Sequence, residues 1–369
     1  MLTMCTFNSE YHATRKVLSA AFFKQKLLSI TKIIKKETID VIKEFQQQGD
    51  HVIDIVEFWV DVQSRIFSSI AVGHNNANVL INFEQEDGST KKNVISQLLR
   101  FIFKDMMNRI GNPFFSIFPE LLPYAIFPSC RRLFHNIQSL RDGIRQIMDA
   151  RLKGEAKGSI DGDLLSIFLQ DPLYRDDPEK TIDDLLILFF AGNETIKTSS
   201  ANTICFLAQH PDIKARVLAE ITPSIEKAAG NFVEDLTVEE TDDFTFLRYC
   251  WYEALRLEPP APISIGSVFV KPVTIGGVQF DIDTVFSINF YAVQRDPKEW
   301  IRPEEFAPER FDPKSPMILR PDGKPRNPFA FCPFFGGKRI CLGKTLAEFM
   351  IVFTLPLVLT HLDFEFENP

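Results

Sequence analysis

Long parts of the chain carry apolar residues three or four positions apart, which is the period of an amphipathic helix. One such stripe covers residues 52–59 (VIDIVEFW) and another covers residues 133–140 (LFHNIQSL). The longest pattern covers residues 181–210, starts at Thr181 as a helix cap and ends before Pro211. It predicts a central helix of about eight turns, so the chain is expected to be mainly α.

After Pro259, short runs of β-branched and aromatic residues replace the helical pattern and predict a small β region. Gly276-Gly277 supplies a tight hairpin turn within this region. The runs cover residues 263–265, 273–275, 278–280 and 285–288. Residues 296–333 are proline-rich and irregular, and a connection of that length is either functional or packed under another element.

The chain has 369 residues, of which 45% are hydrophobic and 24% charged. These values are typical of a globular protein. The length alone suggests two domains. The formal net charge of -8 provides no basic field for a polyphosphate backbone, so nucleic acid is not an expected partner. We predict no membrane span and no signal peptide, because no apolar run is long enough.

The segment FFGGKRICLGKT at residues 334–345 admits two interpretations. It ends in Gly343-Lys344-Thr345 like a phosphate-binding loop, but five residues separate Gly337 from Gly343, where that loop has four. The six cysteines of the chain show neither the paired spacing of zinc sites nor the density of a disulfide scaffold. Cys341 therefore needs a different explanation from nucleotide binding.

Cys341 has the surroundings of a metal-binding thiolate. Nearby cations and the N–H groups at the start of a helix lower the pKa of a cysteine. Lys338 and Arg339 precede Cys341, and the apolar segment 342–359 can begin a helix whose N-terminal donors point at the sulfur. The sequence therefore predicts a lowered thiol pKa at this position.

The pattern Phe334-x-x-Gly337-x-Arg339-x-Cys341-x-Gly343 resembles the haem-binding loop of the cytochrome P-450 family, the haem-thiolate oxygenases. The resemblance implies that residues 334–343 bind haem b and that Cys341 is the axial thiolate ligand of the iron. By the same resemblance, Phe334 shields the sulfur and Arg339 pairs with a haem propionate. Gly337 and Gly343 would let the backbone turn sharply beneath the flat cofactor.

The stretch Ala191-Gly192-Asn193-Glu194-Thr195 is similar to the oxygen-groove motif of the same family. The resemblance implies that Thr195 and Glu194 deliver protons during oxygen activation, and that Ala191 and Gly192 leave room beside the haem in the central helix 181–210. Ile196 departs from the family pattern, which often has a second hydroxyl residue there. Ordinary helix packing against small residues is the alternative interpretation of this stretch.

Glu253 and Arg256 lie three residues apart and can pair on one helix face. Together with Pro308-Glu309-Arg310-Phe311 they resemble a buried structural triad of the family, here Glu253, Arg256 and Arg310. We expect this triad to fix the register of the fold more than to contribute net stability.

Tyr11 and Arg15 are similar to a W-x-x-x-R helix motif whose arginine also binds a propionate, although tyrosine replaces tryptophan here. No second cation for a propionate occurs in residues 261–270, where many relatives carry one. We expect cations on the thiolate side to form the docking surface for an electron-donating reductase. These are Arg15, Lys16, Lys24, Lys338, Arg339 and Lys344.

The resemblance implies a monooxygenase that inserts one atom of O₂ into a small apolar organic substrate, with electrons reaching it from NADPH through a reductase. Although the length alone suggests two domains, the resemblance implies a single domain over residues 1–369. It also suggests association with the endoplasmic reticulum membrane, with a cytoplasmic location otherwise. The proline-broken apolar segment 112–128 would either contact that membrane or form a buried loop.

The family pattern begins before the first residue of this chain and continues past the last. We therefore expect the family fold to lack its N-terminal strands and C-terminal hairpin, which would leave residues 263–268 as an unpaired apolar edge. Two alternative functions follow. One is a truncated, haem-poor binding protein without catalysis, and the other is a haem-thiolate isomerase or peroxygenase that needs no external electrons.

Overall fold

Helices form most of the protein, which confirms the predicted mainly α class. The computed structural model describes residues 9–22, 24–49, 51–73, 79–118, 121, 124, 126–155 and 163–367. The longer helices are α1 (Ser9–Ala21), α2 (Lys24–Gln46), α3 (Ile55–Val72), α5 (Ile95–Ile110), α7 (Pro128–Leu152), α10 (Pro178–Gln209), α11 (Pro211–Lys227), α14 (Thr245–Leu257) and α16 (Lys344–His361). The shorter helices are α6 (Pro113–Ile117), α8 (Leu164–Gln170), α9 (Pro172–Arg175), α12 (Phe232–Asp235), α13 (Val238–Asp242) and α15 (Phe290–Val293).

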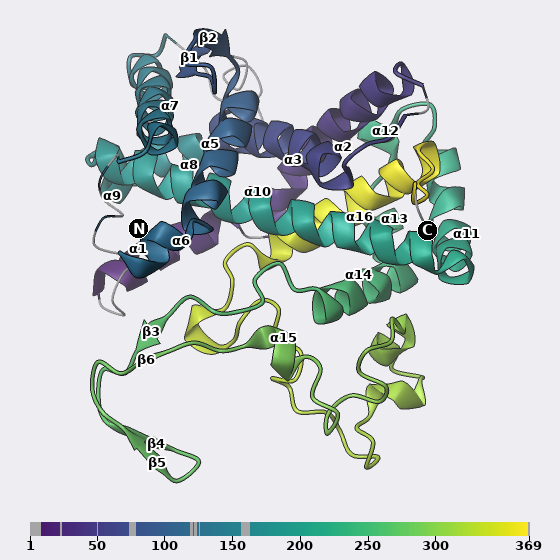
Figure 1. Cartoon of the computed structure of the whole chain (residues 1–369). Helices are drawn as coiled ribbons and strands as arrows, with labels where there is room; N and C mark the ends of the chain where they lie inside the picture. The colour runs from purple at the N-terminus through teal and green to yellow at the C-terminus, as the bar shows by residue number, and fades with distance from the viewer. Residues whose placement is uncertain are drawn as a thin grey trace.

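The long helix α10 runs through the middle of the helical part and packs along α3 (Figure 1). Asp177 caps it by accepting a hydrogen bond from the Lys180 N–H, and Pro178 occupies its first turn. The predicted cap at Thr181 is wrong, because its buried hydroxyl donates to the Tyr174 carbonyl instead. The helix starts one turn earlier since an Asp-Pro pair is a stronger start signal than a single threonine.

The close approach of α10 to α3 depends on Gly192. A Cβ atom at this position would lie 2.2 Å from the Phe67 ring, so only glycine fits without displacing that ring. The neighbouring Asn193 is buried and donates through Nδ2 to Ser64 Oγ at 2.9 Å. These contacts fix the rotation of α10 and leave Thr195 on an exposed face of the helix.

The apolar helix α16 lies in the core against α2, α10 and α11. We predicted no membrane span from the sequence, yet α16 is the one described helix that is long and apolar enough to cross a membrane. Within this helix, 72% of the apolar window is buried inside the protein. Packing in the core therefore accounts for its composition.

The β region is built from two-stranded antiparallel sheets. The turn at Gly276 and Gly277 has φ angles of 59° and 82°, which confirms the predicted hairpin. A further hairpin, β1 with β2, was not predicted because the second strand, TKKN, is polar and short. The pairs are β1 (Ile81–Glu84) with β2 (Thr90–Asn93), β3 (Ser267–Val268) with β6 (Val285–Phe286), and β4 (Val273–Ile275) with β5 (Val278–Phe280).

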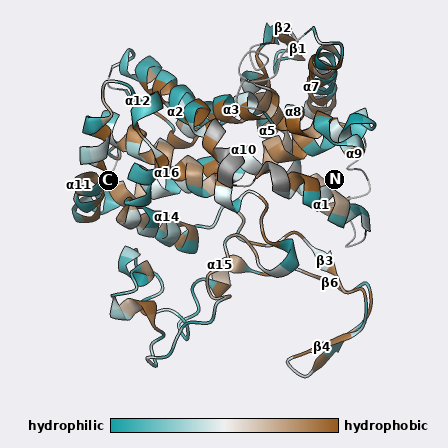
Figure 2. Ribbon diagram, turned by 180° about the vertical axis from the view of Figure 1, so that it is seen from behind, coloured by the Kyte–Doolittle hydropathy of each residue, from teal (hydrophilic) through white to brown (hydrophobic). Residues whose placement is uncertain are grey.

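Residues 263–288 extend away from the helices as an arm that carries β3 to β6 (Figure 1). The predicted strand at 263–265 forms only an isolated bridge between Ile263 and Asn289. Ile263 and Ile265 are each 58% exposed, and β3 pairs with β6 alone among the described strands. Figure 2 shows further apolar residues along β4. The run 263–268, predicted to be unpaired, therefore pairs along one side with residues 285–289, while apolar side chains of this arm remain exposed.

Candidate functional site

The segment from Phe334 to Gly343 forms a tight loop immediately before α16. Phe335 and Gly337 have positive φ angles of 62° and 61°, and the Cys341 N–H donates to the Phe334 carbonyl at 2.8 Å. A left-handed backbone at a non-glycine residue costs free energy and persists only where surrounding contacts hold it. The protein around the loop therefore maintains the conformation that presents Cys341.

Opposing effects act on the Cys341 thiol. Burial raises its pKa, whereas the Gly343 N–H, the Arg15 guanidinium and the Lys344 N–H lower it, and the net shift is upward. The lowered pKa predicted from the sequence is thus wrong for the protein alone, because desolvation outweighs the donors. Cys341 as a whole residue is nevertheless exposed to solvent, although the neighbouring protein desolvates its thiol.

The raised pKa leads to a prediction for the haem-free protein. The rate at which iodoacetamide alkylates Cys341 should rise with pH and reach half of its maximum above the pH found for the urea-unfolded chain, because only the thiolate reacts. Peptide mass spectrometry separates this reaction from that of other cysteines, and Cys130, Cys250 and Cys332 are buried. A half-maximal pH at or below that of the unfolded chain would contradict the role of burial.

Helix α1 contacts the cysteine loop through Tyr11 and Arg15. Tyr11 Oη donates to the Lys338 carbonyl at 3.1 Å, and Arg15 Nη2 donates to the Ile340 carbonyl at 2.8 Å. The Arg339 guanidinium lies 4.1 Å from the centre of the Tyr11 ring. The structure thus brings both arginines predicted to bind propionates to the Cys341 loop.

On α10, Ala191 and Thr195 lie on an exposed face, and the Thr195 hydroxyl donates to the Ala191 carbonyl at 2.8 Å. Glu194 Oε1 lies 2.7 Å from Lys197 Nζ, and both of these side chains are mostly buried. Sequence reasoning missed Lys197, although its position three residues after an acid could have revealed the pair. Gly192 differs from the other predicted residues, because it belongs to the contact with α3.

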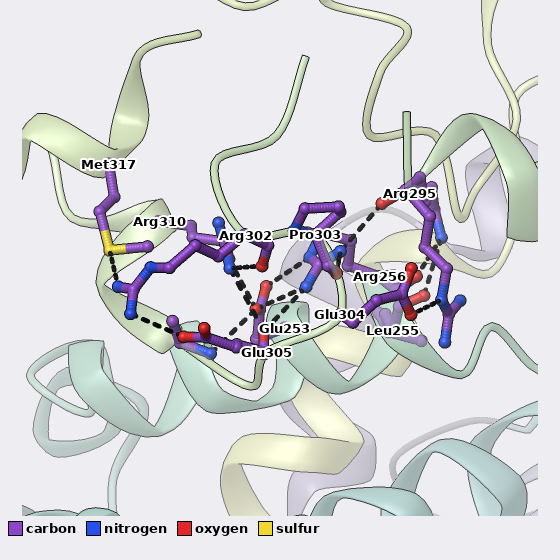
Figure 3. A network of polar contacts seen from close by, with 12 residues as sticks. Glu253, Leu255, Arg256, Arg295, Arg302, Pro303, Glu304, Glu305, Arg310 and Met317 are labelled. Atoms are coloured by element: carbon purple, nitrogen blue, oxygen red, sulfur yellow. Dashed lines mark hydrogen bonds and ion pairs between the residues drawn. The ribbon is translucent and has the colours of Figure 1, made fainter. Parts of the chain in front are cut away.

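Glu253, Arg256 and Arg310 form one fully buried cluster (Figure 3). Glu253 Oε2 accepts from Arg256 Nε at 2.8 Å, and Glu253 Oε1 accepts from Arg310 Nε at 2.9 Å. Burial lowers the pKa of Arg310. Backbone carbonyls satisfy the remaining arginine N–H groups, namely those of Gln294, Ile301, Arg302, Pro303 and Glu305.

This cluster explains why residues 296–333 have a defined shape with little regular structure. Arg310 lies in a short 3₁₀ turn (Pro308–Phe311) and Glu253 lies on α14, so the ion pairs attach the irregular segment to the helix. One carboxylate pairs with both guanidiniums, and backbone carbonyls accept from their other N–H groups. A protein interior tolerates charges that are paired and hydrogen-bonded in this way. The cluster therefore lies between α14 and the irregular segment and joins the two.

Two residues near the loop escaped sequence prediction. Gln294 is fully buried and its Oε1 accepts from the Cys332 N–H at 3.2 Å. Trp251 is also buried, with its ring centre 6.0 Å from that of Phe334. A single amide in the sequence AVQRDP has no charge or periodicity to mark it, and a tryptophan on a helix is most often a core residue.

The donor groups around Cys341 fit a thiolate-ligated haem. The Cys341 sulfur is a soft ligand, and backbone N–H groups point at it. A Cβ on Gly343 would lie 3.9 Å from Sγ, so this glycine keeps the space beside the sulfur open. Arg15 and Arg339 supply positive charge for the haem carboxylates. Among the described residues, no group of three or more His, Cys, Asp or Glu could hold a metal ion instead.

Comparison with known proteins identifies the family of the chain. The family model for cytochrome P-450 matches residues 5–369. Cytochrome P-450 3A6 of Oryctolagus cuniculus is 26% identical over 97% of this chain and 69% of its own length. Cytochrome P-450 76A1 of Solanum melongena is 23% identical over 99% of this chain and 77% of its own.

Among solved structures, retinoic acid bound cyanobacterial CYP120A1 is similar in fold. It has a TM-score of 0.75 and 21% identity, and the match covers 96% of this chain and 72% of that one. The helical architecture thus agrees with a match along nearly the whole sequence. The chain belongs to the cytochrome P-450 family.

Proposed function

We propose that the chain oxidises a small apolar organic molecule with electrons that NADPH supplies through a separate reductase. The family is one of haem-thiolate monooxygenases, which insert one atom of O₂ into the substrate and release the other as water. The observation that carries the proposal is the exposed Cys341, whose sulfur accepts from two backbone N–H groups and lies in the positive field of the Arg15 guanidinium.

The residues of the loop have separate tasks in this proposal. Cys341 would hold the haem iron through its sulfur, Arg15 and Arg339 would pair with the haem carboxylates, and Phe334 would cover the sulfur. A bound haem would supply oxygen activation, which an electron-rich thiolate favours. The N–H groups at the start of α16 stabilise negative charge on the sulfur, because each donates toward it.

Thr195 and Glu194 are proposed to move protons toward the reacting centre. The Thr195 hydroxyl lies on the exposed face of α10 and can exchange its bond to the Ala191 carbonyl for one to a bound water. Glu194, held beside Lys197, would pass protons to that hydroxyl from solvent.

Thr195→Ala tests the proposal directly. Product formed per NADPH consumed should fall by roughly tenfold or more, with hydrogen peroxide released in place of product, because a positioned proton donor is lost. Thr203→Ala is the matched control, since its hydroxyl makes the same bond to the carbonyl four residues earlier but is buried. Unchanged coupling in Thr195→Ala would contradict the role, and product formed without NADPH would favour an isomerase or peroxygenase.

The cations around the cysteine loop are proposed to bind the reductase. Lys16, Lys338 and Arg339 are exposed, and Lys344 is 47% exposed with Glu348 4.0 Å away. Arg15 completes this surface, while the side chain of Lys24, also predicted there, lies outside the described residues. A basic patch on a protein of net charge -8 is suited to an acidic partner.

Lys344→Glu should slow reduction by the reductase by roughly tenfold at low salt, and the difference should shrink as salt screens the charges. Stopped-flow measurement of haem reduction at several ionic strengths gives both quantities. Lys314→Glu reverses an exposed charge in the irregular segment and should leave the rate unchanged. Equal rates for Lys344→Glu and the wild type would rule out this docking surface.

The segment 112–128 is proposed to contact a membrane. Its described residues include α6 and several exposed apolar side chains, among them Ile117 at 69% and Tyr124 at 62% exposure. Residues 119, 120, 122, 123 and 125 lie outside the described part. Flotation of the protein with phospholipid vesicles decides between a membrane contact and a surface loop.

A further inference from the structure

A single buried amide joins the cysteine loop to the ion cluster. We propose that Gln294 is a positioning residue that holds the Cys341 loop in its sulfur-presenting conformation by tying it to Arg256 and the end of α14. The inference deepens the proposed function and rests on Cys341 being the haem ligand.

Both polar atoms of the Gln294 side chain form hydrogen bonds, and the residue has no exposed surface. Its Nε2 donates to the carbonyl of Leu255 at 2.9 Å and to that of Arg256 at 3.1 Å. Its Oε1 accepts from the Cys332 N–H at 3.2 Å, and its own carbonyl accepts from Arg256 Nη1 at 3.0 Å. The side chain therefore connects the last turn of α14 to Cys332, in the segment that leads into the loop.

The bridge continues from Cys332 to the sulfur through backbone hydrogen bonds. The Cys332 carbonyl accepts from the Phe335 N–H at 3.0 Å, and the Phe334 carbonyl accepts from the Cys341 N–H at 2.8 Å. Phe335 is the non-glycine residue of the loop with a positive φ angle. Its ring packs against that of buried Phe290, and the two ring centres lie 5.0 Å apart. Phe290 and Gln294 come from the same short segment at α15, so that segment holds the loop at two points.

An amide is the side chain that this position requires. It must donate to two carbonyls and accept from one N–H, a combination that an amide side chain offers. Glutamate has the same shape but no donors, and leucine fills the volume with no polar partner at all. Both replacements leave buried backbone groups of Leu255, Arg256 or Cys332 without hydrogen bonds, which is unfavourable.

The test compares Gln294→Leu with Val217→Ala, a core substitution on α11 chosen because it lowers thermal stability away from the loop. Gln294→Glu and Gln294→His accompany them, since histidine retains one donor and one acceptor. In the haem-loaded protein we expect amide hydrogen exchange of the peptide covering residues 332–343 to be about tenfold faster in Gln294→Leu and Gln294→Glu. Val217→Ala should leave this peptide unchanged, and Gln294→His should lie in between.

The carbon monoxide difference spectrum provides the second readout. Gln294→Leu and Gln294→Glu should shift part of the reduced protein from the thiolate-type to the non-thiolate-type spectrum, whereas Val217→Ala should not. If the Gln294 variants and Val217→Ala match in both measurements, Gln294 is only a packing residue and the proposal fails. If the wild type shows no thiolate-type spectrum, the proposed function fails, and exchange in the haem-free chains still decides the role of Gln294.

Discussion

Cys341→Ser is expected to abolish the thiolate-type carbon monoxide spectrum and to lower monooxygenase activity by more than about 100-fold. Loss of a residue that merely supports a metal ligand costs 10–100-fold, so loss of the ligand itself should exceed that range. Serine preserves the size of the side chain but offers a hydroxyl, which is a harder and far less acidic ligand than a thiol. The backbone N–H groups and Arg15 would then face a group with no charge to stabilise.

The measurement is the difference spectrum of the reduced, haem-loaded protein, together with its haem content. Cys205→Ser serves as the control because Cys205 is a half-buried cysteine on α10, remote in sequence from the loop. If Cys341→Ser kept the thiolate-type spectrum, a different cysteine would have to be the ligand. Haem uptake without that spectrum is the expected result for this variant.

Glu253→Gln is expected to lower the free energy of unfolding by about 3–5 kcal/mol, which is the usual cost of breaking a buried ion pair on one side. The amide has the same size as the carboxylate but leaves Arg256 and Arg310 buried without a counter-charge. Because the segment 296–333 attaches to α14 through these pairs, we expect it to detach first.

Urea unfolding followed by circular dichroism, with limited proteolysis of residues 296–333, measures both effects. Glu309→Gln is the matched control: Glu309 pairs with Arg216 at the surface, where a single ion pair contributes little. A Glu253→Gln midpoint equal to that of Glu309→Gln would show that the cluster does not hold the fold together.

Much of the helical fold could be predicted because apolar periodicity and cap signals are local properties. The pattern over residues 181–210 corresponds to α10, and the Gly276-Gly277 turn is encoded in two neighbouring residues. The predicted cap at Thr181 lies one turn after the actual cap at Asp177, because both the Asp-Pro pair and the threonine can start a helix. The strand predicted at 263–265 is reduced to a single bridge in the structure. A strand needs a partner, and the sequence of this run does not specify one.

The candidate site could be predicted where a motif is compact, and less well where tertiary environment decides. The motif that identifies Cys341 lies within residues 334–343 and can be read directly from the sequence. The raised pKa of its thiol depends on burial, which residue spacing does not reveal. Gly192 fits a motif, yet its contact with Phe67 depends on how two distant helices pack. Gln294 acquires its role only after the chain folds back on α14.

The contact between α1 and the cysteine loop has a consequence for biosynthesis. The hydrogen bond from Tyr11 to Lys338 spans 327 positions, and the one from Arg15 to Ile340 spans 325. Such contacts close very large loops of chain and form late in folding. During translation, this contact of α1 can form only after nearly the whole of this sequence has left the ribosome, whereas its contact with α8 can form much earlier.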